Sequence, residues 1–248
     1  MIRFTLLLSC YLLLVSFSLL SQSNEVKTLE RESPDKTDST RLRLWATYYY
    51  IPQMNHKESG QAILDKNGRP TGLNLSEQDW CRAAIEGTVM VEKDGQNHLM
   101  SYHSRGDSLQ LDCSQYIDNE RFSSFDKTGR VLWAESTGYG KGTANYQLYP
   151  YKSIAVDPSV IPIGSVVYIP EAVGISYIAG DGNKAVHDGY FLAVDVGSEI
   201  KGQHIDVFLG TSNQSPFPFI RSHPDHAFDA VIVQDQQRQE ELMELHGR

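Results

Sequence analysis

The sequence is short of basic side chains. Lys and Arg together number 22 against 31 Asp and Glu, so the 248-residue chain has a formal net charge of −9 at pH 7. A nucleic-acid-binding protein usually carries a basic face, so this balance argues against nucleic acid as a partner. The sequence also lacks internal repeats and low-complexity tracts. Hydrophobic residues make up 40% of the chain, which is enough for a globular core.

Cysteine is scarce as well. The chain has three cysteines, and Cys10 lies in an apolar N-terminal run, which leaves Cys81 and Cys113. In an oxidising compartment an isolated pair most simply forms a disulfide. A free nucleophilic thiol is the alternative, because "LDCSQYI" around Cys113 is similar to the DCSG motif of cell-wall cysteine peptidases, with His187 as a candidate base. The second cysteine favours the disulfide.

Long apolar runs are absent apart from one at the N-terminus. Residues 4–20 are almost unbroken apolar sequence after Arg3, and small residues follow at 21–23. This pattern predicts a secretory signal peptide over residues 1–23, and therefore a secreted or periplasmic protein. The alternative is an uncleaved leader that anchors the protein, because the run approaches the length of a membrane span. No other contact with a membrane is expected.

The rest of the chain divides by composition. Residues 24–41 are rich in charged and hydroxyl side chains and predict a disordered linker. The folded domain is expected over residues 42–233, followed by a terminal helix and tail at 234–248. Two stretches, 53–87 and 93–130, are interpreted as insertions in this domain, and the second is polar and expected to be irregular.

Short runs typical of strands dominate the folded domain. They are rich in aromatic and β-branched residues and are separated by Gly and Pro. They comprise Trp45–Ile51, Thr88–Glu92, Val131–Ala134, Ser153–Val156, Ser165–Ile169, Tyr190–Asp195, His204–Leu209 and Ala227–Val233. One short helix is expected over Leu75–Gly87, with Ser76 as its N-cap. Because no long helices alternate with the strands, the pattern favours a small, mainly β barrel.

Two carboxylates lie in apolar, strand-like sequence, where burying an ionised group is energetically unfavourable. In "FLAVDVGSEIKGQHIDVFLG", Asp195 ends one apolar run and Asp206 lies inside the next. A buried carboxylate must be paired, hydrogen-bonded or neutralised. Their placement therefore indicates either structural caps or a functional pair.

Three linked motifs carry a family resemblance. "SIAVDPSVIPIGSVVYIP", "AVDVGSEIKG" and "HIDVFLG" resemble, in order, the 3D domain, which is named for three aspartates. Those aspartates are Asp157, Asp195 and Asp206 here. The resemblance spans about residues 131–210, together with "ATYY" in the first strand. In the membrane-bound lytic transglycosylase A family, and in related spore and stationary-phase cell-wall proteins, the domain that these motifs resemble forms the catalytic barrel. The resemblance implies a six-stranded double-psi β-barrel with inserted segments.

The resemblance also implies a reaction. A lytic transglycosylase cleaves the MurNAc–GlcNAc β-1,4 bond of peptidoglycan without water, because the C6 hydroxyl of the sugar closes a 1,6-anhydro ring. One carboxyl group then serves as acid and base, and the resemblance assigns this role to Asp206, without a cofactor or metal. Asp195 would raise the pKa of Asp206 by repulsion or hold the substrate. A monomer acting on glycan strands is expected.

Five further residues are candidates for substrate binding. Thr47 and Tyr49 lie on one face of the first strand, which borders the groove in this barrel family. Lys141 and Lys201 could bind a muramyl or peptide carboxylate, or be solvated lysines. Asp157 opens a turn and is more typical of a backbone acceptor, although the family counts it with the other aspartates.

The chain departs from the usual family motif. "DVGSEIKG" stands where "DTGGAIKG" is usual, so Val196, Ser198 and Glu199 are substitutions. Glu199 adds a carboxylate beside the site, which could alter its pKa values or its substrate preference.

Two other classes of function stay open on the sequence. Double-psi barrels with aspartates also occur in expansin-like proteins, which bind polysaccharide without cutting it. A metal site could be built from His187, Asp188 and His204 with the aspartates, but the sequence has no short two-histidine signature such as HExxH.

The predicted leader gives a direct test. If the signal peptide is cleaved after Ser23, N-terminal sequencing of the exported protein begins at Asn24. An exported protein that keeps its leader would contradict cleavage and support the anchor.

Overall fold

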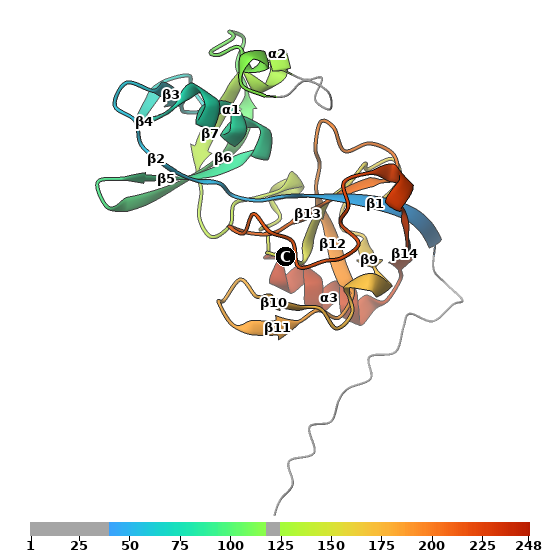
Figure 1. Cartoon of the computed structure of the whole chain (residues 1–248). Coiled ribbons are helices and arrows are strands. Elements are labelled where there is room, and N and C mark those ends of the chain that lie inside the picture. The colour runs from blue at the N-terminus through green and yellow to red at the C-terminus, as the bar shows by residue number, and fades with distance from the viewer. Residues whose placement is uncertain (1–39, 118–124) are drawn as a thin grey trace, which may run out of the picture. The chain divides into compact units, whose positions relative to one another are not determined.

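The computed structural model describes residues 40–117 and 125–248 (Figure 1). The predicted signal peptide and residues 24–39 of the predicted linker lie outside this part. Thr40 and Arg41, expected in the linker, instead begin the first strand. No helix of the described residues is long and apolar enough to cross a membrane.

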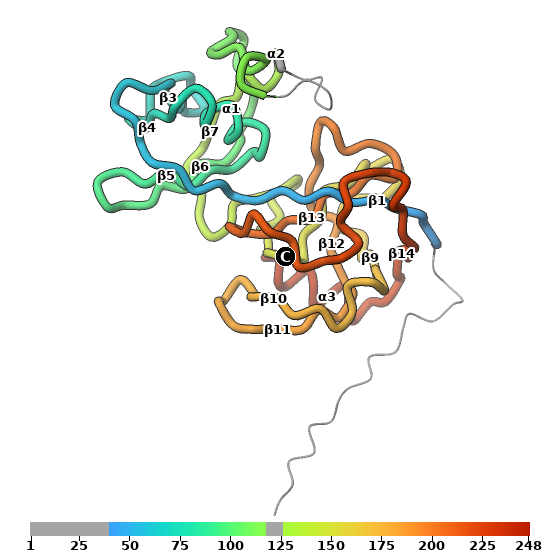
Figure 2. Tube along the Cα trace, viewed as in Figure 1, coloured from blue at the N-terminus to red at the C-terminus, as the bar shows by residue number. Residues whose placement is uncertain are grey.

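Six strands close into a barrel, which confirms the expected fold class. Their order around the barrel is β1 (Thr40–Tyr49), β13 (His204–Phe208), β8 (Ser153–Ala155), β12 (Tyr190–Asp195), β9 (Val166–Tyr168) and β14 (Phe228–Val233). The β1–β13 and β8–β12 pairs are parallel, and the other four pairs are antiparallel. Figure 2 follows the chain from β1, in blue, alongside β13.

Period-two alternation decides which side chains fill the barrel. Leu44 and Ala46 of β1 are buried in its core, as are Ile205 and Val207 of β13. The side chains of Thr47 and Asp206 belong to the other face of their strands, away from the barrel core, and are only partly buried. Because they are Cα partners in the β1–β13 register, they lie directly side by side.

The predicted insertions form a module with its own core. Its elements are the four-stranded sheet β2 (Gln53–Asn55), β5 (Thr88–Lys93), β6 (Gln96–Arg105) and β7 (Val131–Glu135), the hairpin β3 (Gln61–Leu64) and β4 (Pro70–Leu75), and helix α1 (Glu77–Glu86). Trp80 of α1 packs edge-on against Trp133 of β7, with ring centroids 6.5 Å apart, and both side chains are fully buried.

Two predictions about this region are wrong. The 93–130 stretch is not irregular throughout, because the strand β6 occupies ten of its residues. The signal was the dipeptide Asp94-Gly95, both at positive φ, which is the usual two-residue hairpin turn and joins β5 to β6. Val131–Ala134 was counted with the barrel strands, as was Thr88–Glu92, but these runs belong to β7 and β5, which both pair with β6 in the module's sheet.

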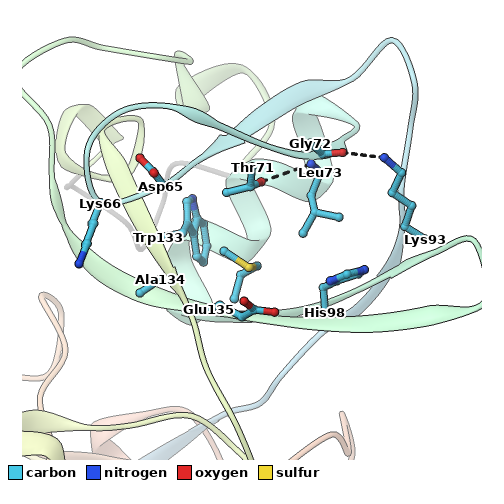
Figure 3. Close-up of a pocket in the computed structure, with 11 residues that line it drawn as sticks. Asp65, Lys66, Thr71, Gly72, Leu73, Lys93, His98, Trp133, Ala134 and Glu135 are labelled. Carbon is cyan, nitrogen blue, oxygen red and sulfur yellow. Dashed lines mark hydrogen bonds between the residues drawn. The ribbon is translucent and has the colours of Figure 1, made fainter.

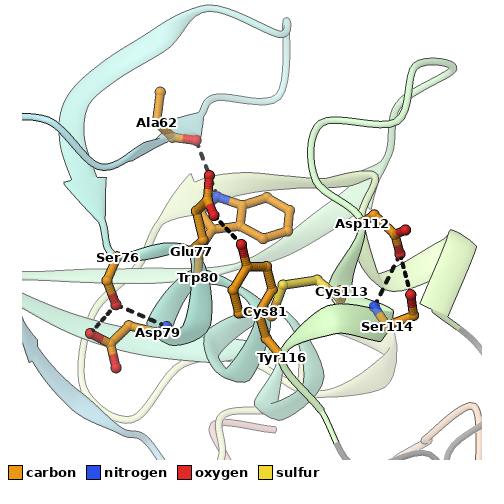
Figure 4. Close-up of a disulfide and its surroundings, with 10 residues drawn as sticks. All are labelled: Ala62, Ser76, Glu77, Asp79, Trp80, Cys81, Asp112, Cys113, Ser114 and Tyr116. Atoms are coloured by element: carbon orange, nitrogen blue, oxygen red, sulfur yellow. Dashed lines mark hydrogen bonds between the residues drawn. A yellow bond between two sulfur atoms is a disulfide. The ribbon is translucent and has the colours of Figure 1, made fainter.

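A disulfide ties α1 to the loop that follows β6 (Figure 4). Cys81 and Cys113 are bonded, with Cα atoms 5.5 Å apart, and both are fully buried. This confirms the predicted pair and excludes Cys113 as a free nucleophile. The helix caps are also confirmed, since the Ser76 hydroxyl accepts from Asp79 N and Gly87 adopts the left-handed conformation.

The remaining elements are short. They are η1 (Cys113–Gln115), α2 (Phe125–Thr128), η2 (Thr143–Asn145), η3 (Pro170–Ala172), β10 (Ser176–Ile178), β11 (Lys184–Val186), η4 (Pro224–His226) and α3 (Gln236–Leu245). Helix α3 is the predicted terminal helix, and its Leu242 packs in a core beside the barrel. His246 after it is buried and bonds the Ser153 hydroxyl of β8 at 2.9 Å.

Removing the disulfide should destabilise the protein without changing the barrel. The bond closes a loop with a sequence separation of 32 residues. In the chain-entropy model a loop of this size contributes about 3–4 kcal/mol. We expect urea titration of a Cys81→Ser/Cys113→Ser double variant to give a free energy of unfolding lower by about this amount. An unchanged free energy of unfolding would contradict a stabilising role.

Candidate active-site groove

A groove of about 1170 Å³ contains the two central aspartates. The barrel contributes Tyr49, Asp195 and Asp206 to its lining, and the module contributes residues at the end of α1 and along β5 to β7. The segment between β7 and β8 completes the wall. Lys141 and Lys201 also line it and are exposed. The structure therefore brings together five of the seven predicted catalytic and binding residues.

Asp206 sits in a chain of hydrogen bonds. The Thr47 hydroxyl donates to Asp206 Oδ1 at 2.7 Å and lies 2.8 Å from His204 Nε2. The other ring nitrogen, Nδ1, lies 3.3 Å from the carbonyl oxygen of Glu199. His204 is stacked on Trp45, with ring centroids 3.6 Å apart, so its ring is fixed. Thr47 thus orients the aspartate, and direct substrate binding by Thr47 stays a prediction.

The same chain accommodates a protonated Asp206. A hydroxyl can rotate and act as both donor and acceptor. With a proton on the carboxyl, Asp206 donates to the Thr47 oxygen, and Thr47 donates to His204 Nε2. His204 then donates from Nδ1 to the carbonyl of Glu199. Each contact has one donor and one acceptor in this arrangement.

Burial in the groove raises the pKa of Asp206 to about 8. Repulsion from Glu86 and then from Asp195 adds to this shift, while the Thr47 hydrogen bond opposes it. Asp195 therefore raises the pKa of Asp206 as the sequence predicted, but desolvation is the larger cause. At neutral pH Asp206 is mainly a neutral acid that can donate a proton.

Asp195 is held differently. Its Oδ2 accepts from the Tyr49 hydroxyl at 3.0 Å, and its Oδ1 accepts from Val196 N at 2.9 Å. Burial raises the pKa of Asp195 to about 6, and these hydrogen bonds limit the shift. Asp195 is therefore mainly ionised at neutral pH, beside an acid that is mainly neutral. Tyr49 contacts Asp195, and its own pKa is raised well above the ordinary value, mainly by burial.

Glu86 is a third groove carboxyl that the sequence analysis missed. It is the last residue of α1, and its Oε2 accepts from Tyr50 N at 3.1 Å. Burial raises the pKa of Glu86 to about 7. A signal was available, because the C-terminal end of a helix disfavours a negative charge and the last turn of α1 has no basic residue to offset it.

Asp157 is placed as a structural residue of the turn. Its Oδ1 accepts from the Ser159 hydroxyl and backbone N, and its Oδ2 accepts from Gly202 N at 2.8 Å. These bonds lower the pKa of Asp157 to about 2, the Ser159 hydroxyl contributing most. It is absent from the groove lining. Its contact with Gly202 holds the loop that joins β12 to β13, and direct substrate binding by Asp157 stays a prediction.

His187, which the sequence analysis considered as a base or a metal ligand, is buried in the barrel, and both of its ring nitrogens have hydrogen-bond partners. His187 Nε2 lies 2.8 Å from Tyr151 O, and Nδ1 accepts from Gly189 N. Asp188 forms an ion pair with Lys152. Neither residue lines the groove. Over residues 40–117 and 125–248, no group of three or more His, Cys, Asp or Glu is placed to hold a metal ion.

A second pocket, of about 700 Å³, lies on the module alone (Figure 3). Leu73, Met100 and Trp133 contribute to its lining, and none of the predicted site residues does. At its edge, Lys93 Nζ donates to Gly72 O at 2.9 Å. Asp65 and Glu135 are the carboxyl residues of its lining, and hydrogen bonds from Arg69 N and Asn67 N lower the pKa of Asp65. The groove, where burial raises the pKa values of Asp195 and Asp206, is therefore the candidate active site.

The comparison with protein families agrees with the motifs. The 3D domain model matches residues 152–216, which include all three predicted aspartates. The predicted resemblance is thereby confirmed for this part of the chain. A stretch of 97 residues is 36% identical to the putative cell wall shaping protein YabE of Bacillus subtilis (strain 168), and it covers 35% of this chain. The match spans only 20% of that protein's length.

Solved structures of similar fold have low sequence identity. The chain is 17% identical to Escherichia coli MltA with bound chitohexaose, covering 77% of this chain and 71% of that one with a TM-score of 0.46. MltA from Neisseria gonorrhoeae is 12% identical, covering 79% and 73%, with a TM-score of 0.48. At such identity, the roles of residues in this chain rest on its own geometry.

Asp206→Asn should stabilise the protein at alkaline pH. Folding raises the pKa of Asp206 from 3.8 to about 8, so the wild type loses stability as pH rises through this range. Asn cannot ionise, and its carbonyl still accepts from Thr47. We expect the unfolding free energy of the variant relative to the wild type to increase by more than about 1 kcal/mol between pH 4 and pH 9 in urea titrations.

An exposed residue supplies the control for this experiment. Asp229→Asn removes a carboxylate from the outer face of β14, where the side chain is 78% exposed. The variant loses a solvent-exposed ion pair with Arg43, which contributes little to stability, so its effect should be much smaller than that of Asp206→Asn at alkaline pH. The prediction is wrong if both variants give the same dependence on pH.

Proposed function

We propose that this protein is an exported lytic transglycosylase that cleaves the MurNAc–GlcNAc β-1,4 bond of peptidoglycan. The proposal is carried by the placement of Asp195 and Asp206 in one groove, where burial raises the pKa of Asp206 to about 8 and that of Asp195 to about 6. Two neighbouring carboxyls whose pKa values are pushed apart are typical of an acid and its charged companion in glycan cleavage. The 3D domain match and the similarity to a putative cell wall shaping protein support a cell-wall substrate.

The reaction needs one proton-transfer group. Asp206 donates its proton to the glycosidic oxygen, and the bond from that oxygen to C1 of MurNAc breaks. The oxygen of the C6 hydroxyl then bonds to C1 and closes the 1,6-anhydro ring. Its proton passes to the Asp206 carboxylate, so the enzyme returns to its starting state without water.

The hydrogen-bond chain supports both halves of this cycle. When Asp206 is charged, the Thr47 hydroxyl donates to it and stabilises the carboxylate. When Asp206 is protonated, the Thr47 hydroxyl turns toward His204. Because Thr47 is fixed by strand pairing and His204 by stacking, the acid keeps its position through both states.

Asp195 is assigned a supporting role. Both of its oxygens already accept hydrogen bonds, which makes it a poor nucleophile and favours the transglycosylase over a retaining hydrolase. Its charge and the Tyr49 hydroxyl can orient the sugar. The exposed Lys141 and Lys201 are assigned to carboxylates of the muramyl group or stem peptide, and no cofactor is required.

A non-catalytic, expansin-like glycan-binding module is the second candidate, favoured by the open groove. A binding surface has no need of a carboxyl held neutral at pH 7, however, because keeping it buried costs stability. The raised pKa of Asp206 is therefore the observation that favours an enzyme.

Product analysis tests the proposal. Residues 24–248, Asp206→Asn and the exposed-site control Asp229→Asn are incubated with purified peptidoglycan, and the released muropeptides are weighed by mass spectrometry. The wild type and the control should release 1,6-anhydro products, each lighter by one water than the hydrolysed form. Asp206→Asn should lower this release by about 10²-fold or more, because the proton donor is lost.

Other outcomes would replace the proposal. Products carrying a reducing MurNAc end would indicate a hydrolase. Sedimentation with the sacculus without any cleavage would indicate the binding module.

A further inference from the structure

The module delivers a carboxyl group to the groove on the barrel. Glu86 is carried by α1 of the module, whereas Asp206 and Asp195 are carried by barrel strands, and all three line the same groove. The charge of Glu86 acts on Asp206 and on Tyr49, which places it within electrostatic reach of both. The groove is thus incomplete without the module.

One backbone hydrogen bond fixes the position of Glu86, and two further contacts lie in the surrounding module. Tyr50 N donates to its carboxylate, and Tyr50 directly follows the groove residue Tyr49. On the next strand, Met90 N donates to Pro52 O at 3.0 Å. Gly140, at φ +84°, passes so close to the module that an added Cβ would lie 2.9 Å from the Ser101 hydroxyl. The bond from Tyr50 N therefore joins the last residue of α1 to the chain that follows β1.

The position of Glu86 is unfavourable for a structural residue. A carboxylate at the C-terminal end of a helix faces the negative end of the helix dipole. It is also partly buried next to two other carboxyls. The hydrogen bond that it accepts from Tyr50 N would be satisfied equally well by the uncharged amide oxygen of Gln.

We infer that Glu86 is a further functional residue of this groove, the anion that stabilises the positive charge arising at sugar C1 when Asp206 gives up its proton. The inference rests on the proposed function. Breaking the bond between C1 and the glycosidic oxygen leaves positive charge on C1, and a fixed anion in a partly desolvated groove lowers the energy of that state. Glu86 forms no covalent bond, and the proton and the C6 oxygen follow the course given above.

Glu86 and Asp206 are proposed to act in different protonation states, Glu86 as the charged carboxylate and Asp206 as the protonated acid. Burial raises the pKa of Glu86 to about 7 and that of Asp206 to about 8, so Glu86 is the one of these two carboxyls that ionises at the lower pH. The charge of Glu86 also keeps Asp206 protonated by repulsion, as does that of Asp195. Raising the pH ionises Asp206, and lowering it neutralises Glu86, so activity should fall on both sides. Arg82 on α1 opposes the shift at Glu86.

Glu86→Gln tests the inference, because it removes the charge and keeps the acceptor for Tyr50 N. We expect turnover on peptidoglycan to fall on the order of 10- to 100-fold, with 1,6-anhydro products unchanged in kind. The acid limb of the pH–rate profile should move to lower pH, because Asp195, with a pKa of about 6, is then the remaining carboxyl whose charge is lost on that side. The alkaline limb should move to lower pH, because Asp206 loses a repulsive neighbour. Glu171→Gln removes an exposed barrel carboxylate outside the groove lining and should match the wild type.

A titration without turnover separates this inference from the proposed function. The carboxyl carbon of Asp206 is followed by ¹³C NMR in the wild type, Glu86→Gln and Glu171→Gln. A lower Asp206 pKa in Glu86→Gln alone supports the inference. An unchanged Asp206 pKa overturns it, even if the wild type makes anhydro products. If the wild type makes none, the proposed function fails and the assignment of Glu86 to C1 fails with it.

Discussion

The parallel pairing of β1 with β13 is the constraint on which the site depends. It sets Thr47 directly beside Asp206, so a hydroxyl meets the carboxyl without relying on a mobile loop. The same alternation sends Leu44, Ile205 and Val207 into the barrel core. A shift of one residue in either strand would exchange the two sets. Core packing therefore fixes the geometry of the acid.

Desolvation in the groove raises the pKa values of the carboxyl groups that this geometry positions. Burial is the largest cause of the raised pKa values of Asp206, Asp195 and Glu86. The barrel alone supplies only part of the wall, and the module closes the other side of the groove. The module is thus more than a stabilised insertion. Its disulfide and its packed tryptophans fix the position of α1, whose last residues line the groove.

The sequence predicted the position of a groove residue correctly where the residue type and the local sequence pattern both pointed to the same role. The three aspartate motifs located Asp195 and Asp206, and the period-two rule placed Thr47 and Tyr49 on the groove side of β1. The β6 strand was missed because its polar composition outweighed the Asp94-Gly95 turn. Glu86 was missed because its importance comes from contacts between distant segments, which local sequence does not encode. Its place at the C-terminal end of a helix was the only local sign.

Neutron diffraction of the deuterated protein at pH 7 would test the central claim most directly, namely that Asp206 is held neutral by the groove. We expect a deuterium on the Asp206 carboxyl directed at the Thr47 oxygen, with the Thr47 deuterium directed at His204 Nε2. A bare Asp206 carboxylate that accepts the Thr47 deuterium, with His204 deuterated at Nε2, would contradict it.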